Sequence, residues 1–131
     1  MIFIDSNVPM YLIGGDHPCK REAKILLERL VSEKERLVTN TEVFQEIMHR
    51  YTAVQNKEAI QPAFDALYGM VDEVYPMIEH DVLSAKDILF SYPNLSARDA
   101  IHAAQMKRLK IERIFSFDRG FDELPSLVRI P

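Results

Sequence analysis

Two kinds of apolar spacing alternate along the chain. Short apolar runs rich in β-branched and aromatic residues are typical of strands buried on both faces, whereas apolar residues three and four positions apart form one stripe of a helix. The runs predict strands at residues 1–4, 36–39, 73–77, 113–117 and 127–130. The stripes predict a helix beginning at residue 8 and further helices over residues 20–33, 41–54, 57–71, 81–90 and 96–109. Strands separated by helices indicate a three-layer α/β/α domain around a mostly parallel sheet.

Capping residues set several of these helix boundaries. Pro9 suits the first turn of the first helix, and Asn40 is an N-cap residue type before the helix that follows the second strand. Ser96 stands three residues before an acid, which is the spacing of a capping box. Pro62 must lie in the first turns of its helix or bend it.

The composition limits the class of protein. With 131 residues and 47% hydrophobic content, residues 1–131 are expected to form a single domain with one core. The single cysteine, Cys19, offers no disulfide framework. No apolar run approaches the roughly 20 residues of a membrane span, and the start lacks the pattern of a signal peptide, so we expect a cytoplasmic protein. The net charge of −4 argues against broad adhesion to nucleic acid or lipid but permits a local basic surface.

Four acids fall where strands end or helices begin. Asp5 and Asp118 follow buried strands, and Glu46 and Asp99 lie within the opening turns of helices. In open α/β sheets ligands bind beyond the carboxyl ends of the strands. We therefore expect these four side chains to meet in one cleft.

Each acid also has a purely structural interpretation, which the sequence leaves open. Asp5 or Asn7 could cap the first helix, and Glu46 could pair with Arg50 one turn further on. Asp99 could complete the cap begun by Ser96, and Asp118 could be a turn residue before Gly120.

Clustered carboxylates repel one another unless a cation or a proton compensates them. Mg²⁺ or Mn²⁺ accepts oxygen ligands and retains bound waters, and such a metal can activate a water for phosphodiester hydrolysis without a side-chain nucleophile. The chain contains neither a Gly-rich phosphate loop nor a Cys or His cluster with zinc spacing. The acids therefore favour a metal-dependent hydrolase.

Four ordered motifs carry a resemblance to a known family. They are Phe3-Ile4-Asp5-Ser6-Asn7, Gln45-Glu46-Ile47, the segment from Ser96 to Ala104, and the segment from Phe115 to Phe121. Together they resemble the PIN-domain ribonucleases, and within them the VapC-type toxins of VapBC toxin–antitoxin pairs. The resemblance implies a divalent-metal-dependent endoribonuclease with an antitoxin protein as partner. It also implies metal binding by Asp5, Glu46, Asp99 and Asp118, with Asn7 and Ser116 as supporting polar residues.

Neighbouring residues leave parts of this assignment open. Glu42 shares the helix face of Glu46, and Asp122 follows closely after Asp118, so either could join the site. His102 lies three residues beyond Asp99, but a lone histidine on an Ala-rich helix is expected to be packed or hydrogen-bonded rather than catalytic.

The sequence also predicts interaction surfaces. Five cations near the end of the chain are candidate RNA contacts: Lys107, Arg108, Lys110, Arg113 and Arg119. Basic side chains of this kind bind phosphates and so position RNA. A solvated, positively charged helix end explains the same residues equally well. The apolar surface of residues 60–71, with Tyr68 and Met70 outside the main stripe, predicts a homodimer.

Three alternatives to a toxin nuclease stay open. The first is a PIN-domain RNA-processing nuclease without an antitoxin. The second is an aspartate-dependent phosphohydrolase with Asp5 as nucleophile, although that design usually needs a second aspartate where this chain has Asn7. The third is a noncatalytic interaction module.

Overall fold

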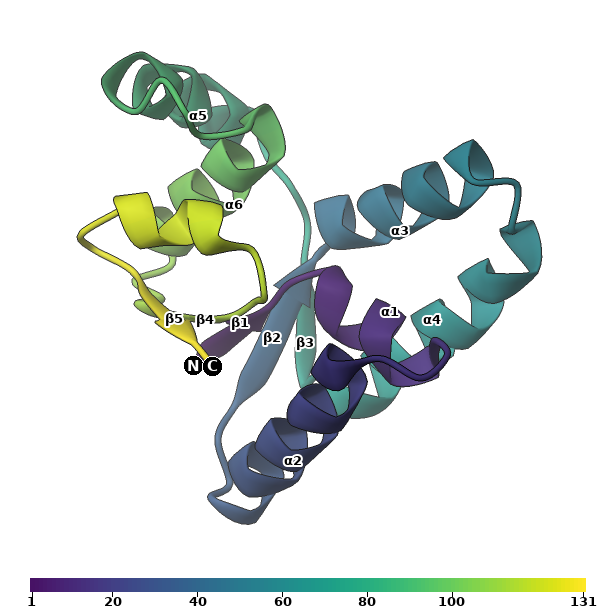
Figure 1. Cartoon of the computed structure of the whole chain (residues 1–131). Helices are drawn as coiled ribbons and strands as arrows, with labels where there is room; N and C mark the ends of the chain where they lie inside the picture. Colours follow the sequence, from purple (N-terminus) through teal and green to yellow (C-terminus); the bar gives the residue numbers. More distant parts are fainter.

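The computed structural model describes residues 1–131 and has a five-stranded sheet at its centre (Figure 1). The strands are β1 (Ile2–Ile4), β2 (Leu37–Asn40), β3 (Glu73–Tyr75), β4 (Arg113–Phe115) and β5 (Val128–Ile130). Their order across the sheet is β3-β2-β1-β4-β5, and each neighbouring pair is parallel. All five predicted strands are present, and the sheet is parallel throughout.

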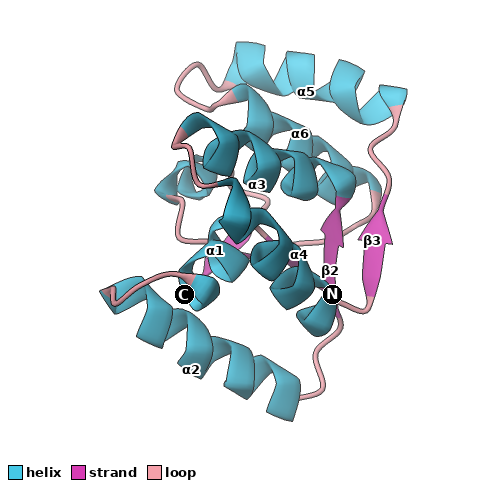
Figure 2. Ribbon diagram, turned by 90° about the vertical axis from the view of Figure 1, so that its right-hand side faces the viewer, coloured by secondary structure: helices cyan, strands magenta, loops and turns pink.

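Six α-helices surround the sheet. They are α1 (Asn7–Ile13), α2 (Pro18–Ser32), α3 (Thr41–Ala53), α4 (Ile60–Met70), α5 (Glu79–Ser91) and α6 (Ala97–Arg108). Helices α5 and α6 pack together on one side of the sheet, and α1, α2 and α4 gather on the other (Figures 1 and 2). The predicted three-layer α/β/α architecture is thus confirmed.

Caps and one proline explain most helix boundaries. Asn40 Oδ1 accepts a hydrogen bond from the Val43 N–H at the start of α3, and Ser96 Oγ accepts one from the Asp99 N–H at the start of α6. Pro62 occupies the first turn of α4, where a missing N–H costs no intrahelical bond. The helix predicted over residues 57–71 therefore divides into a short 3₁₀ turn, η1 (Lys57–Ala59), and α4.

One short element was not predicted from the sequence. The 3₁₀ helix η2 (Arg119–Glu123) follows β4, and Asp118 caps it by accepting a hydrogen bond from the Gly120 N–H. A turn of this length leaves no apolar stripe long enough to recognise in a sequence.

The core lies on both faces of β1. Ile2, Phe3 and Ile4 are at most 1% exposed, as a central parallel strand between two helical layers requires. From β1 the chain builds β2 and β3 on one side and β4 and β5 on the other. The boundary between β1 and β4 is therefore the point where the strand order reverses, and in such sheets a crevice opens there beyond the carboxyl ends of the strands.

None of the helices combines the length and the apolar character that crossing a membrane requires.

Candidate functional site

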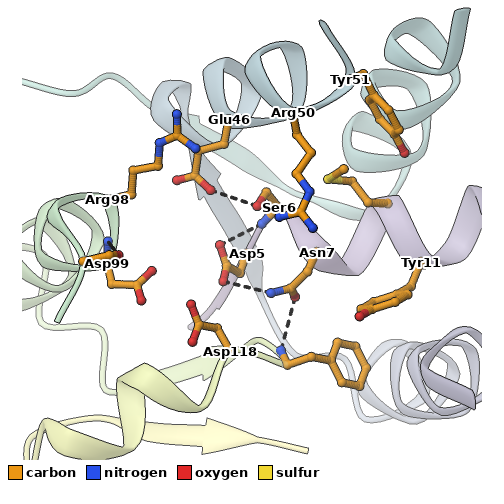
Figure 3. A pocket seen from close by; sticks show the side chains of 13 residues that line it. Asp5, Ser6, Asn7, Tyr11, Glu46, Arg50, Tyr51, Arg98, Asp99 and Asp118 are labelled. Atoms are coloured by element: carbon orange, nitrogen blue, oxygen red, sulfur yellow. Dashed lines mark hydrogen bonds between the residues drawn. The ribbon is translucent and has the colours of Figure 1, made fainter. Parts of the chain in front are cut away.

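A pocket of about 610 Å³ opens at the carboxyl ends of β1 and β4. The four predicted acids all line it, and they come from four separate elements (Figure 3): Asp5, Glu46, Asp99 and Asp118. Asp5 follows β1, Glu46 is on α3, Asp99 is in the first turn of α6, and Asp118 lies between β4 and η2. The structure thus brings the four predicted side chains to one pocket.

Asp5 is held at the floor of the pocket by three donors. Its Oδ1 accepts from the Ser6 N–H at 2.8 Å, and its Oδ2 accepts from Ser116 Oγ at 2.6 Å and Asn7 Nδ2 at 3.3 Å. The α1 N-cap residue is Ser6 and no side chain caps that helix, so the capping interpretation of Asp5 and Asn7 is wrong. Burial raises the pKa of Asp5, with a further contribution from the charge of Glu46.

Asn7 and Ser116 connect the two strand ends, as supporting residues would. Asn7 Nδ2 also donates to Ser116 Oγ at 3.3 Å, and Asn7 Oδ1 accepts from the Phe117 N–H at 3.2 Å. Ser116 Oγ in turn accepts from the Asp118 N–H at 3.0 Å. These bonds fix the separation of Asp5 and Asp118 across the β1–β4 boundary.

Glu46 is oriented by two hydrogen bonds. Its Oε2 accepts from Ser6 Oγ at 2.9 Å, and its Oε1 lies 2.5 Å from His102 Nε2. Burial alone would raise the pKa of Glu46, but the hydrogen bonds from His102 and Ser6 outweigh it and lower that pKa. Glu46 forms no salt bridge with Arg50, so the helix-pair interpretation of this acid is wrong.

Asp99 and Asp118 form the other side of the pocket. Burial, the adjacent Asp118 carboxyl group and Asp5 together raise the pKa of Asp99 to about 8. The Ser96 cap uses the backbone N–H of Asp99, which leaves the Asp99 carboxylate directed into the pocket (Figure 3). Asp118 serves both roles foreseen for it, since one oxygen accepts from the Gly120 N–H at 2.8 Å while the side chain lines the pocket.

The two acids that could have replaced them lie elsewhere. Neither Glu42 nor Asp122 lines the pocket. Asp122 instead forms a two-pronged salt bridge with Arg129, at 2.9 and 3.0 Å.

The structure does not bring the predicted basic group to the pocket. Arg108 forms two hydrogen bonds with Asp81, and Arg113 forms two with Glu35. Lys107 and Lys110 stand at the C-terminal end of α6, whereas Asp99 is at its N-terminal end. Arg119 follows Asp118 but is not among the residues that line the cavity.

Two cations that the sequence analysis did not select line the pocket instead. They are Arg50 on α3 and Arg98 on α6, and neither forms a salt bridge (Figure 3). Their positions carried a usable signal, because Arg50 lies one helical turn after Glu46 and Arg98 immediately precedes Asp99.

The donor set suits a divalent cation. Asp5 and Glu46 approach each other closely enough to share an ion, since one carboxylate oxygen of each lies within 4.8 Å of the other and of a His102 ring nitrogen. Burial, together with the neighbouring Asp118 and Asp5, raises the pKa of Asp99, and a cation bound among these carboxyl groups would offset their mutual repulsion. Carboxylate oxygens in this number are typical ligands of Mg²⁺ or Mn²⁺.

Comparison with known proteins yields consistent similarities. Residues 2–127 match the family profile described as PIN domain. The chain is 56% identical over 130 residues to ribonuclease VapC13 of Mycobacterium tuberculosis, covering 99% of each protein. A crystal structure of VapC20 from the same organism, described as a sarcin-ricin loop cleaving toxin, has a TM-score of 0.81 at 20% identity and covers 99% of this chain and 98% of its own. A toxin–antitoxin complex from Klebsiella pneumoniae has a TM-score of 0.68 at 18% identity and covers 98% of this chain and 96% of its own.

Proposed function

Because this chain belongs to the PIN domain family, we propose that it is a divalent-metal-dependent endoribonuclease that acts as the toxin of a type II toxin–antitoxin pair. The observation that carries the proposal is the convergence of Asp5, Glu46, Asp99 and Asp118 on one pocket where the strand order reverses. The raised pKa of Asp99, to about 8, supports the proposal, because buried acids placed close together are typical of functional sites.

The four acids would hold Mg²⁺ or Mn²⁺. When bound, such an ion lowers the pKa of a coordinated water and neutralises charge on the phosphate oxygens. Asp5 is the best fixed of the four acids, since three donors hold its carboxyl group, whereas two hold that of Glu46. Asn7 and Ser116 link Asp5 to Asp118 through hydrogen bonds, so these two acids are positioned before an ion binds.

Arg50 and Arg98 would bind the RNA backbone. Guanidinium groups bind phosphate oxygens, and these two side chains stand among the acids without an acidic partner of their own. They also offset the negative potential that would otherwise repel RNA from the pocket. Of the basic group predicted from the sequence, Lys107, Lys110 and Arg119 remain proposed contacts for more distant phosphates. Arg108 and Arg113 would first have to leave their ion pairs.

Protein partners follow from the relatives and from the surface. Solved relatives include a toxin–antitoxin complex, and on this ground we propose an antitoxin that covers the pocket. Tyr68 on α4 is 61% exposed and packs its ring against Phe44, with ring centroids 4.8 Å apart. This apolar surface supports a homodimer, although Met70 packs against the core rather than extending the surface. A cytoplasmic location fits a substrate of this class.

The phosphohydrolase alternative finds no support at Asn7. Its amide is engaged with Asp5, Ser116 and the Phe117 N–H, so no carboxylic acid stands where that chemistry needs one.

The test is a cleavage assay with purified, partner-free protein, RNA substrates and Mg²⁺ or Mn²⁺, run beside a small phosphomonoester. RNA cleavage that depends on the metal and is lost in Asp99→Asn supports the proposal. Hydrolysis of the phosphomonoester alone, or no RNA cleavage under any metal condition, contradicts it.

A further inference from the structure

Behind Glu46, on the side away from the pocket, three buried side chains form a continuous chain of hydrogen bonds. They are Asn40 at the end of β2 and His102 and Gln105 on α6, and each is at most 1% exposed. None of the three lines the pocket. Buried polar groups of this kind are costly unless every donor meets an acceptor, so the direction of each bond is informative.

Two backbone groups fix that direction from opposite ends. The Val43 N–H can only donate, so Asn40 presents its oxygen there, at 2.9 Å. The Pro76 carbonyl can only accept, so Gln105 presents its Nε2 there, at 3.0 Å, and its Oε1 to Asn40. The remaining group of Asn40, Nδ2, then donates both to Gln105 Oε1 at 2.8 Å and to His102 Nδ1 at 3.0 Å.

This polarity determines which imidazole nitrogen carries the proton. Because His102 Nδ1 accepts from Asn40, the single proton of the neutral imidazole lies on Nε2. That nitrogen is 2.5 Å from Glu46 Oε1 and donates to it. The His102 ring also packs against Phe3, with ring centroids 5.2 Å apart, which restricts its rotation.

We propose that His102, held in one tautomer by Asn40, is a positioning residue that turns Glu46 toward the metal. With Oε1 bound from behind by His102, Glu46 keeps Oε2 on the side where Ser6 and the pocket lie. A glutamate has several rotatable bonds, and fixing them before the ion arrives removes an entropy cost from binding. The inference rests on the proposed nuclease function and adds a residue that touches neither metal nor RNA.

A matched pair of substitutions tests it. His102→Leu removes the donor at similar volume, whereas His102→Gln retains an N–H of similar reach. We expect His102→Leu to weaken Mn²⁺ binding, measured by calorimetry, and to lower kcat for RNA, each about 10- to 100-fold, with little change in KM. His102→Gln should recover most of both losses.

The control is Met106→Ala, a change to a fully buried residue on the same helix that takes no part in the hydrogen-bonded chain. It should lower the melting temperature without changing Mn²⁺ affinity or kcat below that temperature. If His102→Leu behaves like Met106→Ala, or binds Mn²⁺ as the wild type does, the positioning role is overturned.

A second measurement needs neither metal nor substrate. Nitrogen-15 NMR of the metal-free protein, with His102 assigned by its absence in His102→Gln, should show the neutral ring protonated on Nε2. Asn40→Asp keeps a good cap for α3 but places a carboxylate against Nδ1, so the ring then lies between two carboxylates and should carry a proton on both nitrogens. A wild-type ring protonated on Nδ1 overturns the inference. If the protein binds Mn²⁺ but cuts no RNA, the nuclease proposal is refuted, while Mn²⁺ affinity and the NMR spectrum still decide the role of His102. If the protein binds no Mn²⁺, both the nuclease proposal and the role of His102 are refuted.

Discussion

Gly120 lies against the carboxylate of Asp99, so closely that a Cβ atom at position 120 would stand 3.1 Å from Asp99 Oδ2. The same atom would stand 3.1 Å from Asp118 Oδ1. Glycine is therefore needed at this position for space, because its φ angle is not positive and other residues could adopt its backbone conformation. The two carboxylates keep their mutual approach only while position 120 lacks a side chain.

Gly120→Ala should consequently displace both acids by a few tenths of an ångström and lower RNA cleavage about tenfold, since small misplacements in an active site are costly. The measurement is kcat at saturating Mn²⁺. Gly69→Ala is the matched control, because a Cβ there meets nothing within 4 Å. It should leave cleavage unchanged and raise stability by less than about 1 kcal/mol, because Gly69 lies in the last turn of α4. Equal activity of the two variants would show that position 120 does not shape the site.

The raised pKa of Asp99 predicts an unusual dependence of stability on pH. In the folded, metal-free protein the Asp99 carboxyl group keeps its proton up to about pH 8, whereas in the unfolded chain this group loses its proton near pH 3.8. Between these values the folded state binds more protons, so its free energy of unfolding falls as pH rises from about 4 to about 8. Asp99→Asn should flatten this slope and, at pH 8, melt about 4 °C or more above the wild type, which corresponds to about 1 kcal/mol. Urea melts of both proteins at several pH values check the sign, and parallel pH profiles would contradict the assignment.

Mn²⁺ should stabilise the wild type. A cation that binds only the folded state adds RT ln(1 + [L]/Kd), which is about 2.7 kcal/mol at a hundredfold excess over Kd. Asp99→Asn should remove most of this gain and abolish RNA cleavage while the protein stays folded, because the Ser96 cap uses only the backbone N–H of residue 99. Thermal melts with and without Mn²⁺ decide the matter. A wild type without a metal response, or a variant that loses about 1 kcal/mol as a damaged cap would, would leave Asp99 with a structural role only.

Arg50→Ala and Arg98→Ala should weaken RNA binding through lost phosphate contacts. Each should raise KM several-fold and reduce the slope of log affinity against log salt by about one. Lys110→Ala, at the far end of α6, serves as comparison and tests the basic group predicted from the sequence. A larger effect at Lys110 than at either arginine would move the RNA path to that end of the helix.

The sequence predicts this fold well because its signals are local. Each strand is a short apolar run between helical stripes, and a carboxylate that follows such a run, as Asp5 does, must lie at the sheet edge where ligands bind. Asn40 shows which contacts cannot be predicted from local sequence signals. Its capping bond to Val43 is local and predictable, but the other half of its amide meets His102 and Gln105, which lie 62 and 65 residues further along the chain. The ion pairs of Arg108 with Asp81 and of Arg113 with Glu35 are equally non-local, so the sequence does not reveal that these two candidate RNA contacts are already engaged.

The hydrogen bond from Ser116 to Asp5 joins residues 111 positions apart and runs across the boundary between β1 and β4. This bond can form only when the chain closes a loop of that length, which has an entropic cost. Until β4 pairs with β1, Ser116 and Asp118 are not in place and one side of the pocket is missing. A folding intermediate or a fragment that ends before β4 would thus lack the donor that fixes Asp5. The proposed nuclease activity would then require the completed fold, so folding itself would be the first control on RNA cleavage.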